Sequence, residues 1–509
     1  MKRSILVLLL LLTSACTVGP DYVPPVVEAP PAFHHAEDSP SEEPSTSDSA
    51  EDVETGWWKV LGDDVLNQLV LDAVTHNHDL EQATARVREA QAGRRASAAR
   101  GLPQVGASAE GRLFEGSENA PGPNGALAEA GLADLEDDAY FLGLSASWEI
   151  DLFGGIRRSV EAAEARIAVA EEGRRAVLLG VIAEVARTYT ELRGTQRRLE
   201  LAEKNVELQQ GTYEVVQTRA RVGLVSELDE RRAAAQLEGT RSRVPPLRAT
   251  VRMAAHRLAV LTGRSPAELL DTLLEVRPLS DPPDLVPVGL PSELLARRPD
   301  VRLAERQLAA ATADVGVRTA DLYPRFSLTG AAGLDSSSFA DLFAGASRTW
   351  NLAAGLTAPI FQGGRIRAGI EAAEARTDAA LAAYHQAVLS ALEDVENALV
   401  NYAEEELRRR TLTEAAQASG RATELARILY DKGLEDYLTV LDAERNLTEV
   451  EDRLAQSETG VVLRLVGLYA ALGGGWEEFT PRTPTPGSAS KSESPSSTSS
   501  GLPARAASE

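Results

Sequence analysis

One stretch of the sequence occurs twice, and it decides the fold. The first copy reads Gly154-Gly155-Ile156-Arg157 and then Glu161-Ala-Ala-Glu-Ala-Arg166; the second reads Gly363-Gly364-Arg365-Ile366-Arg367 and then Glu371-Ala-Ala-Glu-Ala-Arg376. Glu371 follows Glu161 at a numbering offset of 210 (371 − 161), and Gly433 follows Gly223 at the same offset, at the far end of each copy. An offset that holds over such a long stretch indicates an internal duplication.

Each copy predicts one very long helix that ends at a glycine. In the first copy, the 66 residues from Arg157 to Val222 would extend roughly 100 Å as a helix, so they must lie against other helices. Because Gly223 and Gly433 can adopt the left-handed conformation that ends a helix, each copy is expected to fold back as a hairpin with an exposed tip. A plain coiled-coil spacer would show the same pattern. Apolar residues at every seventh position predict the contact face: Leu178, Val185, Leu192, Leu199, Val206, Tyr213 and Ala220.

The residues around each copy are related as well. Helical patterns at residues 66–99 and 290–320 each end before a proline, in Leu102-Pro103 and in Tyr323-Pro324, which are related by a numbering offset of 221 (323 − 102). The returning helices differ, because Pro245-Pro246 must break the helix of the first copy only. An irregular belt around the rods is expected from three segments: residues 54–65, 263–291 and 473–480.

Four segments alternate apolar and polar residues, at residues 105–113, 140–151, 326–332 and 350–360. Alternation with period two places the apolar side chains on one face of a strand, and these segments are close to the roughly 9–11 residues that cross a bilayer as a tilted strand. They predict transmembrane β-strands; a soluble sandwich is the alternative. Because a single-chain barrel needs at least about eight strands and open edges in lipid leave backbone groups unpaired, four strands predict that the chain oligomerises.

The N-terminus has the pattern of a signal peptide with a lipid attachment site. Lys2-Arg3 precedes an apolar run at residues 5–12, which is too short to span a membrane, and small residues then precede Cys16. Cleavage before Cys16 would expose its thiol for covalent lipidation and membrane anchoring; an incidental cysteine is the alternative. Since Cys16 is the only cysteine, the chain can form no internal disulfide.

Composition and motifs argue against two functional classes. The formal net charge is −24, with 52 basic and 76 acidic residues, whereas a nucleic-acid-binding protein needs a basic surface. The sequence contains no nucleophile elbow, phosphate-binding loop or dinucleotide-binding motif, and His76 and His78 have no third metal ligand nearby in the sequence. We therefore expect no nucleic-acid partner, no enzymatic activity, no metal, and no cofactor other than a covalent lipid on Cys16.

These features divide the chain into five parts. Residues 1–15 form the signal peptide, and the Pro-, Ser- and acid-rich residues 16–55 are expected to be a lipid-anchored, disordered tether. Residues 56–290 form the first repeat, with a helix, two strands and a long helical hairpin, and residues 291–475 form the second. Residues 476–509 are a C-terminal segment with a disordered tail.

Several short motifs resemble a known family. Cys16-Thr-Val-Gly-Pro-Asp-Tyr22, Trp57-Trp58 and Asn77-x-Asp79-Leu80 resemble the lipoprotein branch of the TolC-like outer-membrane efflux factors, often labelled NodT-type or OprM-like. The resemblance extends from residue 16 to about residue 475 and includes the duplication. It implies a mainly α fold with a four-strand transmembrane β segment, assembled as a trimer whose 12-stranded β-barrel continues into a long α-helical barrel.

The resemblance also implies a function and a location. Members of this branch are exit ducts of tripartite efflux pumps that export drugs or other small molecules. They are lipid-anchored in the bacterial outer membrane and have a periplasmic helical extension. The implied partners are further copies of the chain in a homotrimer, a periplasmic adaptor protein, an inner-membrane transporter of the RND type, and outer-membrane lipid. The alternatives are an outlet of a type I protein secretion system and a lipid-anchored coiled-coil spacer without a pore.

The resemblance places functional residues at the hairpin tips. It implies that Leu438 and Asp442, in Tyr437-Leu-Thr-Val-Leu-Asp442, face the pore at its periplasmic end, where Leu438 forms an apolar constriction and the Asp442 carboxylates of a trimer repel one another. The alternative is that Leu438 is a seam residue between hairpins and Asp442 a solvated charge. The expected docking surface for the adaptor comprises the exposed tips: Gly223, Leu224, Val225, Gly433, Leu434 and Glu435.

The duplication also suggests a latch between the tips. Arg232 precedes Asp442 by the same offset as the two helical copies and therefore occupies the equivalent position. Our hypothesis is that Arg231 or Arg232 pairs with Asp442 or Asp436 of a neighbouring tip and holds the pore shut. Because exposed ion pairs contribute only about 0–1 kcal/mol each, several of them in a ring would form a latch that a partner protein can release.

Overall fold

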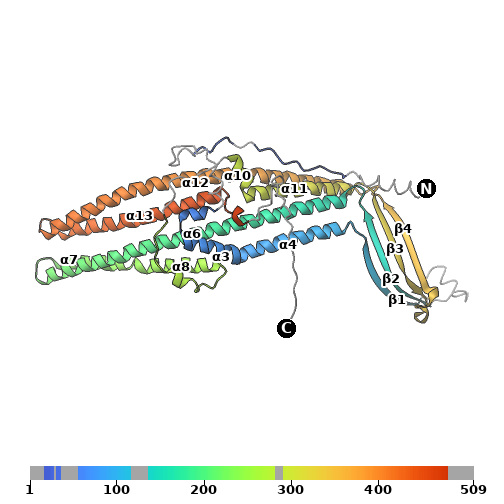
Figure 1. Ribbon diagram of the computed structural model, residues 1–509, viewed down its shortest axis with the longest axis horizontal. Helices are drawn as coiled ribbons and strands as arrows, with labels where there is room; N and C mark the ends of the chain where they lie inside the picture. Colours follow the sequence, from blue (N-terminus) through green and yellow to red (C-terminus); the bar gives the residue numbers. More distant parts are fainter. Residues whose placement is uncertain (1–16, 28–29, 36–55, 116–135, 281–290, 480–509) are drawn as a thin grey trace, which may run out of the picture.

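The computed structural model describes residues 17–27, 30–35, 56–115, 136–280 and 291–479. The chain is strongly elongated, with a β-sheet at one end and the tips of two helical hairpins at the other (Figure 1). The helices of the first repeat are η2 (Trp57–Leu61), α3 (Asp64–His76), α4 (His78–Ala99), α6 (Gly155–Arg221), α7 (Glu227–Arg241), α8 (Val244–Leu261) and α9 (Leu270–Leu273). Those of the second are α10 (Pro291–Arg297), α11 (Pro299–Ala320), η3 (Phe339–Asp341), η4 (Gly345–Ser347), α12 (Arg365–Asp431) and α13 (Tyr437–Ala471), and η5 (Glu477–Phe479) follows in the C-terminal segment.

The two predicted rods are present as α6 and α12, each 67 residues long. The predicted seven-residue seam of α6 is right for its first half, where Leu178, Val185 and Leu192 are fully buried. Farther along, the buried positions are Gln209 and Val216, which also lie seven residues apart but three positions away from the predicted line. A straight helix drifts by about 20° per heptad relative to a 3.5-residue repeat, so one seam cannot stay buried over the whole rod.

The helices in front of each sheet segment are interrupted, which the sequence interpretation missed. The predicted helix at residues 66–99 is split at Asn77, whose side-chain oxygen accepts hydrogen bonds from the backbone of Asp79 at 2.9 Å and Leu80 at 3.2 Å. The second helix is split between α10 and α11 at Arg298, which is the counterpart of Asn77 in the duplication. By contrast, the predicted break at Pro245-Pro246 is confirmed. α7 ends at Arg241, and α8 begins at Val244 with both prolines in its first turn, whereas α13 continues for 35 residues.

The four strands form one antiparallel sheet in the order β1-β2-β3-β4: β1 (Gln104–Glu115), β2 (Glu136–Ile150), β3 (Arg325–Ser336) and β4 (Arg348–Thr357). The junction between the two repeats is the pairing of β2 with β3, in which Leu142 lies opposite Leu334. The predicted end of the last strand at residue 360 is wrong for the single chain. β4 ends at Thr357, and the side chain of Ile360 is 98% exposed.

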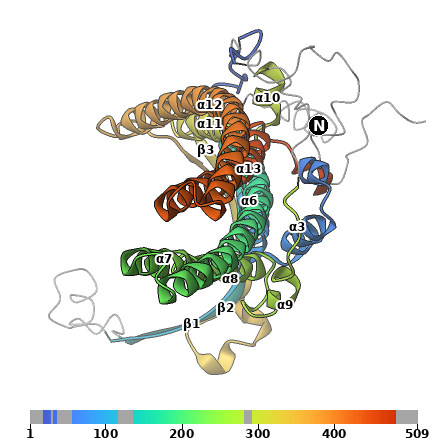
Figure 2. The same cartoon turned by 90° about the vertical axis from the view of Figure 1, so that its left-hand side faces the viewer.

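The helical hairpins form one curved layer. Figure 2, a view along the rods, shows α12, α13, α6, α7 and α8 side by side, with α3 and α9 on the convex side. The described part of the expected belt, residues 56–65, 263–280 and 473–479, lies here and contributes to the largest apolar cluster, in which Trp57 stacks on Tyr469 with ring centroids 5.4 Å apart and Trp58 stacks on Phe479 at 5.7 Å. Residues 54–55, 281–290 and 480 lie outside the described residues. Leu273 of α9 belongs to the same cluster. The belt therefore fastens both repeats at the middle of the molecule.

The N-terminal segment runs alongside the helices of the second repeat. Residues 17–27 and 30–35 run as a dark blue trace beside α11 and α12 (Figure 1). These residues of the expected disordered tether contact the folded part of the chain. Arg158, which is buried, donates hydrogen bonds to the carbonyl oxygen of Val18 and to the carboxylate of Asp21, and Phe33 is buried in the main apolar cluster. Residues 36–55, the rest of the expected tether, lie outside the described residues, as do Cys16 and the signal peptide.

Among the described helices, none has an 18-residue stretch that is apolar enough to cross a membrane.

Candidate functional site

Both hairpin tips are built by the same local geometry. α6 and α12 each end two positions before a glycine with positive φ, Gly223 at 76° and Gly433 at 72°. The amide of Leu224 donates to the carbonyl of Arg219, and the amide of Leu434 donates to that of Leu429, both at 2.9 Å. This is the pattern of a helix closed by a left-handed glycine, so the predicted glycine stops are confirmed.

The tips are exposed, with one exception. The side chains of Leu224 and Leu434 are 74% and 68% exposed, and Glu435 is also exposed. Val225, which the docking prediction includes, is instead half-buried against the small apolar cluster around Tyr437. The exposure of the two leucines agrees with their expected place at the tips, and their contact with an adaptor stays a prediction.

The two predicted gate residues lie one turn apart on α13. Leu438 is 41% exposed and Asp442 is exposed. Within the single chain neither side chain belongs to a buried cluster. Their role as a constriction depends on neighbouring copies of the chain and stays a prediction.

The latch residues have other partners in the single chain. Arg231 pairs with Glu227 at 3.3 Å, and Arg232 pairs with Asp229 at 3.7 Å, both within α7. The carboxylate of Asp436 accepts a hydrogen bond from the backbone amide of Thr439 at 3.0 Å and so caps α13. The structure does not bring the arginines to Asp436 or Asp442 within one chain, and pairing between neighbouring chains stays a prediction.

A buried glutamate joins the two hairpins near the tips, and the sequence interpretation missed it. Glu444 of α13 is 4% exposed. It accepts a hydrogen bond from the side-chain amide of Gln209, on α6, at 2.8 Å and forms an ion pair with Arg427, on α12, at 2.8 Å. Burial and the negative charge of Glu444 raise the pKa of Tyr437 to about 12. The sequence contains no local signal for this link, because Gln209 lies off the predicted seam of α6.

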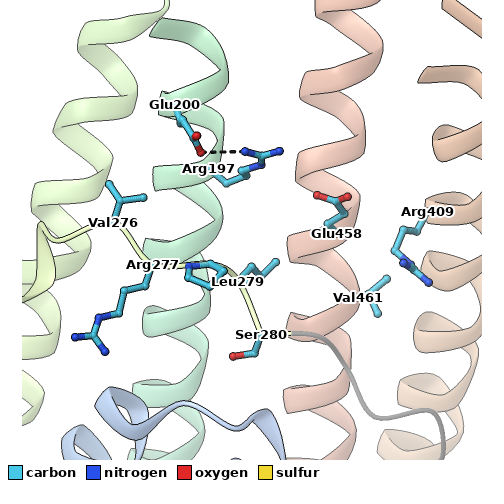
Figure 3. A pocket seen from close by; sticks show the side chains of 10 residues that line it. Arg197, Glu200, Val276, Arg277, Leu279, Ser280, Arg409, Glu458 and Val461 are labelled. Atoms are coloured by element: carbon cyan, nitrogen blue, oxygen red, sulfur yellow. Dashed lines mark hydrogen bonds and ion pairs between the residues drawn. The ribbon is translucent and has the colours of Figure 1, made fainter. Parts of the chain in front are cut away.

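A hollow of about 430 Å³ lies at the middle of the rods, between α6, residues 276–280 and the second hairpin (Figure 3). Arg197, Arg277 and Arg409 line it. Each of these arginines is already paired with a nearby glutamate, as Arg197 is with Glu200 at 2.9 Å. Paired and partly exposed guanidinium groups leave little charge to bind an anion, so we assign this hollow no ligand.

The histidines considered as metal ligands lie apart from any metal-binding cluster. His76 contacts the carbonyl oxygen of Asp72 at 3.0 Å, and His78 contacts the carboxylate of Glu81 at 3.2 Å. No group of three or more His, Cys, Asp or Glu side chains that could hold a metal ion occurs in the described part of the chain.

The sheet has one apolar face, as the alternation predicts. The pairing of the four strands brings their apolar positions into line across the sheet, as in the row formed by Ala109, Leu142, Leu334 and Arg348, where only β4 contributes a polar residue. Several large members of this face are exposed to the surroundings of the single chain: Val105, Leu113, Leu144, Trp350, Leu352 and Leu356. Such a surface is suited to lipid.

Comparisons with known proteins agree with this geometry. Residues 69–264 and 290–474 match the sequence profile of a family described as outer membrane efflux protein. The chain is 32% identical over 484 residues to outer membrane protein OprJ of Pseudomonas aeruginosa, covering 92% of this chain and 95% of OprJ. It is 30% identical to nodulation protein T of Rhizobium leguminosarum bv. trifolii, covering 91% and 94%. The solved structure of the outer-membrane channel OprN is 38% identical, with a TM-score of 0.82, over 91% of this chain and 100% of that chain.

Proposed function

Because the chain belongs to the outer membrane efflux protein family, we propose that it is one subunit of a homotrimeric exit duct that spans the outer membrane and the adjoining periplasm. As a family member it is an outer-membrane efflux channel with a periplasmic helical extension, and it acts in an efflux pump. The resemblance to NodT-type and OprM-like proteins is thereby confirmed.

The observation that carries the trimer proposal is an incomplete sheet. β1 and β4 are edge strands, each with one side unpaired, and the apolar face beside them is suited to lipid. Unpaired backbone groups in hydrocarbon cost several kcal/mol each, and four strands are too few to close a cylinder. Three copies bring together twelve strands, and the curved helical layer of Figure 2 continues as the wall of a helical barrel.

The remaining parts of the proposal concern attachment, partners and gating. Cys16 carries the covalent lipid that anchors the chain in the outer membrane. Leu224 and Leu434 are the apolar contacts for a periplasmic adaptor protein, because their side chains are exposed at the ends of the rods. An inner-membrane transporter of the RND type drives drugs or other small molecules through the adaptor into the duct. Leu438 and Asp442 narrow the duct at the tips until the adaptor binds.

Planar-bilayer recording of the purified full chain tests the duct and its gate. We expect trimers in detergent, a resolved single-channel conductance, and a larger conductance for Asp442→Arg, since the reversed charge would repel Arg231 or Arg232 of a neighbouring tip instead of pairing with it and holding the duct shut. Glu449→Arg is the matched control, because Glu449 is an exposed residue farther along α13 whose ion-pair partner in the described part of the chain is Arg453 of the same helix. Monomers without conductance would overturn the duct, and equal conductance of the two variants would overturn the gate.

The class of exported molecule is tested separately. A strain that lacks the protein should become more susceptible to small toxic compounds, with its set of secreted proteins unchanged. Loss of a secreted protein with unchanged susceptibility would instead assign the duct to type I protein secretion.

A further inference from the structure

We propose that β4 of one subunit pairs with β1 of the next subunit in an antiparallel register in which paired residue numbers add up to 465, and that this pairing extends β4 to residue 360. The inference rests on the proposed multi-subunit duct and specifies how its subunits join. It follows from the internal duplication, because the chain already contains one such junction, between its own two repeats.

The duplication extends into the sheet with fixed offsets. Tyr323-Pro324 is the counterpart of Leu102-Pro103 at a numbering offset of 221, so β3 corresponds to β1 with that offset. Gln104 of β1 is paired with Ser147 of β2, and its counterpart Arg325 is paired with Thr357 of β4. The offset from Ser147 to Thr357 is 210 (357 − 147), which is also the offset of the helical copies. Strands and rods therefore repeat together.

The junction inside the chain supplies the register. Across the β2–β3 junction, Leu142 is paired with Leu334 and Ile150 with Phe326. Adding 210 to the β2 number and subtracting 221 from the β3 number transfers each pair to the free edges. Leu352 of one subunit then lies opposite Leu113 of its neighbour, and Ile360 lies opposite Val105.

The lengths of the strands support this transfer. β2 continues to Ile150, and its last three residues pair with β3. The counterparts of those three residues are residues 358–360, which follow the end of β4 at Thr357. Ile360 is 98% exposed and Val105 is 69% exposed, whereas Ile150 and Phe326 are half-buried at the internal junction. Residues 358–360 have no partner strand in the single chain, and Pro359 among them has no N–H to donate, so it is tolerated at the edge of a sheet.

The faces of the strands also agree with the register. In it, Leu356 lies opposite Ala109 and Leu352 opposite Leu113, so apolar side chains meet on one face. A slip by one residue would place Leu356 opposite Ser108 and turn one strand's apolar face to the wrong side. A slip by two residues keeps the faces and is the alternative that an experiment must exclude.

The helices next to the sheet follow the same rule. α11 packs against α6 at the internal junction and has ten buried residues. Its counterpart α4, at the free edge of the first repeat, has two buried residues. By the transferred geometry, α12 of one subunit covers the exposed side of α4 in the next, and the subunit boundary is continuous from strands to rods.

Disulfide cross-linking of the full chain in native outer membranes tests the register. β1 and β4 lie on opposite edges of the sheet, so a disulfide between them joins two subunits. Leu113→Cys with Leu352→Cys, and Gly111→Cys with Ala354→Cys, add up to 465 and are expected to give cross-linked dimers and trimers on non-reducing gels. The same cysteines recombined as Gly111 with Leu352, or Leu113 with Ala354, are slipped by two residues. Their Cβ atoms would lie about 7–8 Å apart, beyond disulfide reach, so much less cross-linked product is expected than from the pairs that add up to 465.

The internal pair Leu142→Cys with Leu334→Cys is the matched control, because these residues are paired within one chain and should give an intramolecular disulfide if the sheet has folded. Stronger cross-linking of a slipped pair would overturn the register while leaving the trimeric duct standing. Conducting trimers that cross-link with none of the four pairs would overturn the β4–β1 junction. Monomers without conductance would overturn the duct itself, and the junction with it.

Discussion

Replacing Glu444 with alanine is expected to loosen the hairpin tips without unfolding the rods. The hydrogen bond from Gln209 to Glu444 joins two buried side chains and is worth about 1.5–3 kcal/mol, as a bond to a charged group. The ion pair from Arg427, whose side chain is partly exposed, adds about 0–1 kcal/mol. Together they stabilise the closed arrangement of the hairpins by about 1.5–4 kcal/mol.

Hydrogen exchange measured by mass spectrometry reads this loss directly. Local opening follows the local free energy, so amides of α12 and α13 near Glu444 should exchange about tenfold to several-hundred-fold faster in Glu444→Ala. Amides around the belt should be unaffected. Exchange in Glu444→Gln is expected to be faster than in the unmodified protein and slower than in Glu444→Ala. Its amide oxygen still accepts the hydrogen bond from Gln209 but carries no charge for the ion pair with Arg427.

Glu449→Ala is the control for this experiment. Glu449 is also on α13, but it is exposed, and its ion-pair partner in the described part of the chain is Arg453 of the same helix, a contact worth about 0.2–0.5 kcal/mol. If exchange near the tips is as slow in Glu444→Ala as in Glu449→Ala, the buried link does not hold the hairpins together and the reasoning is wrong.

Three further predictions concern the belt, the turns and the N-terminal segment. Trp57→Ala removes a buried ring stacked on Tyr469 and should destabilise the chain by about 3–5 kcal/mol in calorimetry; an unchanged melting temperature would contradict the belt as the fastening point. Gly433→Ala should cost about 1–2 kcal/mol because of its positive φ, whereas Gly211→Ala, inside α6 with open space around it, should stabilise by about 0.5–1 kcal/mol; two effects of the same sign in calorimetry would refute this. Although burial opposes it, hydrogen bonds from His34 and His35 lower the pKa of Glu396. The stability that Glu396 gives to the N-terminal segment is therefore present above the ordinary glutamate pKa and is lost as the pH falls through the lowered pKa. Hydrogen exchange of residues 30–35 should become faster in acid, and Glu396→Gln should remove this pH dependence.

Much of the architecture could be predicted because it depends on sequence patterns that act over a few residues. The repeated glycines, the alternating strands and the double proline each act on the backbone within a few residues, and the structure confirms the rods, the sheet segments and the break in the first returning helix. The split at Asn77 was also local, since an asparagine two residues before Asp79 is a capping signal, but the continuous apolar pattern on both sides concealed it.

The features that could not be predicted depend on contacts between distant segments. Glu444 looks in the sequence like any acidic residue on a helix surface, and only the approach of α6 buries it. Phe33 is one aromatic residue in a polar stretch, and its burial depends on a cluster assembled from both repeats. Ile360 follows an apolar alternation correctly, yet the strand cannot reach it in a chain that lacks the neighbouring edge.

The double proline in the first repeat makes the two hairpins mechanically unequal. The returning arm of the first hairpin has a joint between α7 and α8, where residues 242 and 243 separate two helical segments. The returning arm of the second hairpin is a single rigid strut. In a cylinder made from such chains, hairpins with a jointed returning arm and hairpins with a rigid returning arm alternate around the wall. A force applied at the hairpin tips would therefore bend the jointed returning arms first. In a trimer the opening would widen at three positions around the wall and not at all six hairpins.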